Sequence, residues 1–146
     1  MIQDFVKAWD ANKSKLSKFI ASHNQDEYGC YSSIVQMLFS VVINPYMASI
    51  GQDVFDLERI HEIDDGDYQG TLLYLIPKET YQPSSHEYVA TFVYYGSCSV
   101  CDTLYGIQSD GNDSNKVPSK EQVKGYMDLC LHILQHCKFP FNYEED

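Results

Sequence analysis

The segment Tyr88–Tyr95 constrains the fold of this chain more than any other stretch. Seven of its eight residues are aromatic or β-branched, the types that fit a pleated sheet. A second strand-like run, Thr71–Ile76, ends at Pro77, and an alternating run, Leu57–Ile63, comes before it. The turn residues Asp64-Asp65-Gly66-Asp67 separate these two runs. Three successive strands with short connections predict an antiparallel meander.

Two helices are predicted before the sheet. Residues 3–22 place their apolar side chains near one face at helical spacing, which indicates an amphipathic helix. A second, almost wholly apolar helix is expected from Ser32 or Ser33 to about Val42. Asn44-Pro45 should end it, because the residue before a proline is pushed out of helical geometry.

Two further helices are predicted after the sheet. The first is a short one over Ser99–Ile107, and the polar segment Ser109–Pro118 follows as a flexible loop. Ser119 and Gln122 match a capping box that opens a longer helix to about Cys137. The sequence therefore predicts an α+β fold in one domain, 1–146: a three-stranded antiparallel meander with two helices before and two after it.

Charge is unevenly distributed along the chain, whose formal net charge is −11. Residues 1–18 carry four lysines against two aspartates, and the remainder holds nineteen of the 21 acids but six of the ten bases. Such a body repels phosphates, which argues against direct binding of nucleic acid, and it attracts basic protein surfaces. The alternative is that the acidity serves solubility alone.

Seven acids cluster around the first strand and its turn, with Arg59 as the one base among them. They are Asp53, Asp56, Glu58, Glu62, Asp64, Asp65 and Asp67. The spacing does not match a calcium loop. One interpretation is a solvated strand edge whose charge discourages aggregation. The other is a protein-binding array, since carboxylates on a strand face are spaced comparably to phosphates and fit a basic groove.

Two cysteines, Cys98 and Cys101, stand three residues apart where a helix is expected to begin. With His132 and His136 they would complete a zinc site, although thirty residues separate the pairs and both histidines should point into solvent. A helix N-terminus could also lower the pKa of a thiol, which neighbouring Asp102 opposes. No histidine can be assigned as the base of a cysteine nucleophile. Metal-binding, redox and purely structural interpretations stay open.

The five cysteines are odd in number and sparse, so free thiols in a reducing compartment are expected. No run of about 20 apolar residues predicts a membrane span, and the first residues lack the pattern of a signal peptide. A cytoplasmic protein without membrane contact is the expectation.

Two stretches resemble a pair of motifs in uncharacterised small phage and prophage proteins. They are Asp64-Asp65-Gly66-Asp67-Tyr68-Gln69-Gly70-Thr71-Leu72 and Tyr95-Gly96-Ser97-Cys98-Ser99-Val100-Cys101-Asp102-Thr103-Leu104. The second motif usually has glycine where this chain has Val100, which argues against a need for positive φ there. The resemblance covers about a third of the chain. It implies a viral or prophage source, and therefore the cytoplasm of a bacterial host, but no reaction.

Charge and resemblance together predict a small, non-enzymatic interaction protein without a cofactor. Its partner would be a basic surface on a nucleic-acid-handling host protein, and inhibition of host defence of the anti-CRISPR type is one specific form. The alternative is a zinc-binding or thiol-dependent protein centred on Cys98 and Cys101. The sequence does not specify the target, the oligomeric state or which tyrosines are exposed.

Overall fold

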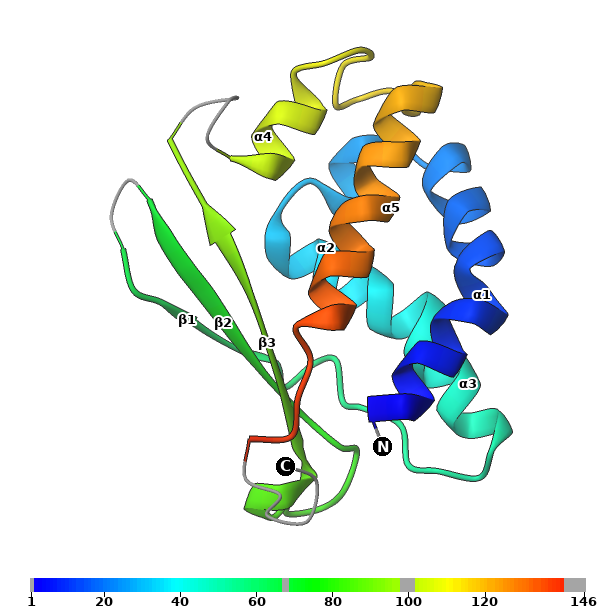
Figure 1. Cartoon of the computed structure of the whole chain (residues 1–146), viewed down its shortest axis with the longest axis vertical. Helices are drawn as coiled ribbons and strands as arrows, with labels where there is room; N and C mark the ends of the chain where they lie inside the picture. The colour runs from blue at the N-terminus through cyan, green and yellow to red at the C-terminus, as the bar shows by residue number, and fades with distance from the viewer. Residues whose placement is uncertain (1, 67–68, 98–101, 141–146) are drawn as a thin grey trace.

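The structure is a computed structural model that describes residues 2–66, 69–97 and 102–140. Its elements in chain order are α1 (Ile2–Ser22), η1 (Gln25–Tyr28), α2 (Tyr31–Leu38), η2 (Phe39–Ile43), α3 (Asn44–Ser49), β1 (His61–Asp64), β2 (Gly70–Pro77), η3 (Ser85–Glu87), β3 (Tyr88–Tyr95), α4 (Thr103–Gln108) and α5 (Lys120–Gln135). The strands form an antiparallel meander in the order β1-β2-β3. The predicted α+β fold is confirmed. Since α2, η2 and α3 are consecutive parts of one helical stretch, α1 and this stretch are the two long helices before the sheet, and α4 and α5 follow it. The sheet lies on one side of the molecule and the helices on the other (Figure 1).

The predicted helix over residues 3–22 is confirmed as α1. Its buried face includes Phe5, Leu16 and Ile20, which are fully inaccessible to solvent. The ring of Phe5 meets the rings of Phe39 and Phe55 edge-on, at centroid distances of 6.0 and 5.8 Å. Edge-to-face contacts of this kind add about 0.5 to 1.5 kcal/mol to the burial of each ring. The aromatic cluster therefore joins α1 to the middle of the second helical stretch.

The prediction that Asn44-Pro45 ends the second helix is wrong. The helix continues to Ser49, with Pro45 in the first turn of α3. Proline lacks an N–H group, and the π-helical turn η2 accommodates it: the Asn44 N–H bonds to the carbonyl of Phe39, five residues back. Burial of Met47 beyond the proline makes the continuation favourable.

The sheet turns one face toward the helices. Tyr74 and Ile76 of β2 and Val89 and Val93 of β3 are buried on this inner face. The strand Tyr88–Tyr95 has the predicted bounds, and β2 extends one residue beyond the prediction at each end. The first strand, predicted over Leu57–Ile63, is only partly right, because β1 begins at His61. All four residues of β1 are exposed, so β1 is an edge strand that the helices do not cover (Figure 1).

The helix predicted over Ser99–Ile107 begins later, at Thr103, because Asp102 is its N-cap and has extended backbone geometry. The capping box of Ser119 and Gln122 is confirmed, and α5 ends at Gln135. Figure 1 shows α5 between the sheet and α1, and α5 contacts both α1 and β3.

The loop predicted to be flexible, Ser109–Pro118, is tied to the body by two buried glutamines. The Gln25 side chain donates to the carbonyls of Asn112 and Asp113 at 3.1 and 3.2 Å. The Gln122 side chain accepts the Asn112 N–H at 3.1 Å and donates to its carbonyl at 3.0 Å. These bonds satisfy loop backbone groups that would otherwise need water.

Within the described ranges, no helix combines the length and the apolar character that a bilayer crossing requires.

Candidate functional site

The predicted acidic residues lie along β1 and in the segments on either side of it. Asp53, Glu58, Glu62, Asp64 and Asp65 are exposed, Asp56 is half-buried, and Asp67 lies outside the described residues. The structure brings two of them, Glu62 and Asp64, onto the inner face of the edge strand, where each lies opposite a β2 residue of that face. Glu58 and Asp56 lie beside a separate depression near Glu79. The cluster is therefore spread along one side of the molecule, with its centre on β1.

Basic side chains leave most of this acidic side unpaired. Among the described residues, the ion pairs are Lys13 with Asp10 at 3.8 Å and Arg59 with Asp56 at 2.7 Å. The four lysines of residues 1–18 are exposed on α1, which lies across the helical layer from β1 (Figure 1). The molecule is thus electrically asymmetric, with a basic helix on one side and an acidic sheet edge on the other.

Two tyrosines hold the carboxylates of β1 in place. The Tyr74 hydroxyl donates to Glu62 Oε2 at 2.7 Å, and the Tyr95 hydroxyl donates to Asp64 Oδ1 at 2.5 Å. The Tyr95 bond, with a further bond from the Gly66 N–H, lowers the pKa of Asp64 below its ordinary value. Burial raises the pKa of Tyr74, and the bond to Glu62 adds to that effect. Asp64 therefore stays ionised at neutral pH, and the two hydrogen bonds hold both carboxylates in a fixed direction.

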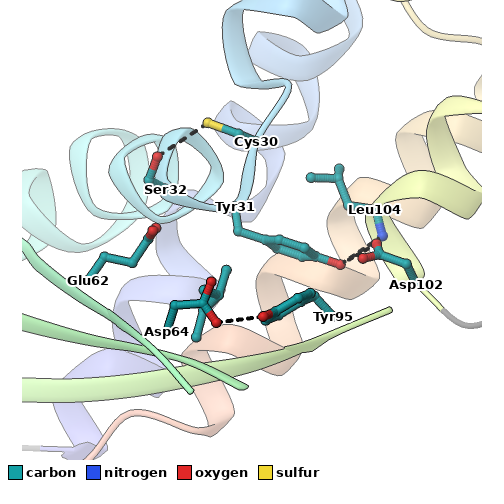
Figure 2. Close-up of a pocket in the computed structure, with 9 residues that line it drawn as sticks. Cys30, Tyr31, Ser32, Glu62, Asp64, Tyr95, Asp102 and Leu104 are labelled. Atoms are coloured by element: carbon teal, nitrogen blue, oxygen red, sulfur yellow. Dashed lines mark hydrogen bonds between the residues drawn. The ribbon is translucent and has the colours of Figure 1, made fainter. Parts of the chain in front are cut away.

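A groove of about 380 Å³ separates these carboxylates from the helices. Figure 2 shows Glu62 and Asp64 on the strand side of the groove, facing the first turn of α2. Tyr31 reaches across from α2 toward the start of α4 (Figure 2). Carboxylates, hydroxyl groups and aromatic rings thus share one open groove, whose lining suits a cationic or hydrogen-bonding side chain.

Asp102 closes the far end of the groove. Its buried carboxylate accepts the Tyr31 hydroxyl at 2.6 Å, the Gly96 N–H at 2.9 Å and the Tyr105 N–H at 3.0 Å. The Tyr31 hydroxyl in turn accepts the Leu104 N–H at 3.1 Å. One side chain therefore joins the end of β3, the start of α4 and the start of α2. Sequence analysis treated Asp102 only as a neighbour of the cysteines. Aspartate is nevertheless a preferred N-cap residue, and Asp102 stands directly before the helix that begins at Thr103.

Cys98 and Cys101 lie outside the described residues, so the zinc and thiol hypotheses remain predictions. Their proposed histidine partners differ from one another: His132 is exposed as expected, but His136 is not free in solvent. Its ring stacks on Phe92 at 4.1 Å, and its Nδ1 lies 3.0 Å from the Phe92 carbonyl oxygen. In the described part of the chain, no three His, Cys, Asp or Glu side chains gather in a way that could hold a metal ion.

A thiol that sequence analysis did not single out, Cys30, lines the groove at the N-cap of α2. Burial alone would raise its pKa, but hydrogen bonds with Ser32 and Ser33 outweigh that effect and lower the pKa. Cys130 and Cys137 are buried, and burial raises the pKa of each to about 12. Cys30 is therefore the most reactive thiol among these three.

Comparison of the chain with protein-family models, with curated proteins and with solved structures found no match in any of the three.

Proposed function

We propose that this chain is a non-enzymatic interaction protein whose acidic edge binds a basic surface on another protein. The observation that carries the proposal is the exposure of Glu62 and Asp64 on an edge strand, where no lysine or arginine of the described residues pairs with them. Acidic residues that only balanced nearby bases would have formed ion pairs within the fold. A fixed, unpaired array instead leaves its field available to a cationic partner.

The partner we propose is a nucleic-acid-handling protein of a bacterial host, with the chain acting in the host cytoplasm as a phage or prophage product. Proteins that hold nucleic acid present basic grooves, to which an acidic strand edge is complementary. The net charge of −11 supports this partner over nucleic acid itself. Inhibition of an RNA-guided defence nuclease is the first form to test, because such nucleases hold their heteroduplex in a positively charged channel.

The test combines capture with a charge-matched pair of variants. The tagged protein is used to capture proteins from a bacterial lysate, and each captured protein is purified and titrated against it. Affinity should fall steeply between about 50 mM and about 500 mM salt, because screening weakens exposed charge pairs. Glu62→Gln with Asp64→Asn should weaken binding about tenfold, whereas Glu121→Gln with Asp128→Asn on α5 should not, although both pairs change the net charge equally.

Either of two results would contradict the proposed function. One is a captured partner whose affinity is insensitive to ionic strength and to the β1 variants. The other is tight binding of the purified chain to bare duplex DNA, which the acidic field should prevent.

A further inference from the structure

The free edge of β1 exposes backbone groups as well as carboxylates. Asp65 donates its N–H to the carbonyl of Thr71 at 3.2 Å, in the register that pairs Ile63 with Leu73 and His61 with Leu75. Bonded and non-bonded pairs alternate along an antiparallel ladder, so the N–H and C=O groups of Glu62 and Asp64 point away from β2. In the described part of the chain no strand pairs with that edge. These groups can therefore bond to an added strand.

The opposite edge of the sheet is covered. Ala90 of β3 exchanges backbone hydrogen bonds with Lys138, at 2.8 and 2.9 Å, in the segment that follows α5. His136 lies at the carbonyl oxygen of Phe92 on the same edge. Chain from the body thus occupies the β3 edge at Ala90 and Phe92, whereas no described segment pairs with the β1 edge, which makes β1 the edge available to another chain.

The side chains of β1 alternate in chemistry between the two faces of the sheet. Glu62 and Asp64 face the groove, whereas Ile63 on the outer face is 49% exposed and pairs with Leu73. A strand laid against β1 would place alternate side chains beside the two carboxylates and the intervening ones beside Ile63. Complementarity therefore requires basic residues at alternate positions with an apolar residue between them.

A second copy of this chain does not satisfy that requirement. If two β1 strands paired antiparallel about Ile63, Glu62 of each copy would lie opposite Asp64 of the other, on the same face. Like charges directly opposite one another destabilise a strand pair. The same carboxylates that disfavour self-pairing favour a basic strand.

We propose that β1 accepts an extended basic segment of the partner protein as a fourth, antiparallel strand. Lysine or arginine residues at alternate positions lie over the groove beside Glu62 and Asp64, and the apolar residue between them packs on Ile63. This inference rests on the proposed function, and it adds the form of the partner: a strand, recognised through backbone hydrogen bonds as well as charge.

The test uses three peptides with the same charge. The parent is acetyl-Lys-Val-Lys-Val-Lys-amide, one analogue is N-methylated on the backbone nitrogens of its lysines, and the other is N-methylated on those of its valines. Methylated lysines cannot donate to β1, whereas the valine N–H groups point away from it. Binding is followed by NMR titration, together with hydrogen exchange of the Glu62 and Asp64 amides.

Methylation of the lysines should weaken binding at least about tenfold, and methylation of the valines less than about twofold. The Glu62 and Asp64 amides should gain protection from exchange when the parent peptide binds. Dimerisation of the protein through β1 without peptide, or failure of the parent peptide to bind, would overturn the inference.

The two proposals fail in distinguishable ways. If all three peptides bind equally and Glu62→Gln with Asp64→Asn weakens each of them, strand addition is wrong while the acidic-surface function stands. If Glu62→Gln with Asp64→Asn leaves the binding of the peptides and of a captured partner unchanged, just as the control pair Glu121→Gln with Asp128→Asn does, the acidic edge is not the site. Both proposals then fail.

Discussion

Replacement of Tyr31 by phenylalanine tests whether the Tyr31–Asp102 contact holds the end of the groove together. The substitution removes a hydroxyl that donates to a carboxylate and accepts the Leu104 N–H. A hydrogen bond to a charged group contributes about 1.5 to 3 kcal/mol, so Tyr31→Phe should lower the free energy of unfolding by about 2 kcal/mol. Asp102→Ala removes the cap of α4 as well and leaves the Gly96 N–H unpaired, which should cost about 3 to 4 kcal/mol.

The two losses should not add. The Tyr31–Asp102 bond is counted in both single variants, so the double variant should fall short of the sum by about 1 to 2 kcal/mol. Urea unfolding of the parent, both single variants and the double variant gives this coupling energy. Tyr105→Phe is the control: its side chain is 55% exposed, and its free energy of unfolding should change by less than about 0.5 kcal/mol.

The ionisation of Tyr31 determines the pH at which the urea unfolding experiments should be done. Burial, with the bond to Asp102 second, raises the pKa of Tyr31 above its ordinary value. The neutral hydroxyl is thus favoured in the folded state. Its contribution to the free energy of unfolding is complete below a pH of about 10 and is lost as the pH rises through the pKa of the folded state. At pH 7, additive losses within about 0.3 kcal/mol, or a cost of Tyr31→Phe below about 0.5 kcal/mol, would refute this account of the contact.

Two further predictions concern the lining of the groove. Brief alkylation of the native protein near neutral pH, read by peptide mass spectrometry, should label Cys30 ahead of Cys130 and Cys137; equal labelling of the three would contradict the assigned burial. Tyr95→Phe should raise the pKa of Asp64 toward its ordinary value, as measured by NMR titration. The pKa of Asp64 is lower in the folded than in the unfolded state. The ionised Asp64 therefore stabilises the folded protein above the unfolded-state pKa, and this stabilisation is lost as the pH falls through the folded-state pKa.

Local sequence signals predicted the strands and the long helices because those elements repeat one residue preference over many positions. The run Tyr88–Tyr95 is the clearest case, since aromatic and β-branched residues continue over its whole length. The prediction was wrong where a single side chain changed the backbone. From Leu57 the alternating pattern indicated a strand, but Asp56 accepts the Glu58 N–H at 3.1 Å and the Arg59 Nε at 2.7 Å, which forms a turn instead.

Pro45 shows why tertiary contacts can override a local rule. The rule that a helix ends before proline describes the cost of a clash and of a missing N–H group. It does not include the burial of Met47 or the contact between α3 and α1, which are formed only if the helix continues. The π-helical turn η2 reduces the local cost, and long-range packing then determines the outcome.

The acidic character of the site was predictable from the sequence, but its geometry was not. The sequence located seven acids around one strand, whereas the strand register decides that Glu62 and Asp64 lie on the inner face of the sheet. The role of Asp102 depends on Tyr31, which lies 71 residues away in the sequence. Contacts over that separation have no periodic signal in a single sequence, and a pattern-based reading therefore missed the residue that closes the groove.

The fixed carboxylates of the edge strand bear on the choice between two interpretations of the acidic cluster. Charge on an edge strand is a common means of preventing aggregation, and by itself it does not indicate a partner. Here, however, tyrosine hydroxyl groups hold Glu62 and Asp64 over a groove, although unrestrained carboxylates would block self-pairing equally well. Ordering side chains before binding reduces the entropy that a partner's binding must overcome. The tyrosine bonds therefore support the proposed recognition surface, on which repulsion of a second copy and attraction of a basic strand would arise from the same two residues.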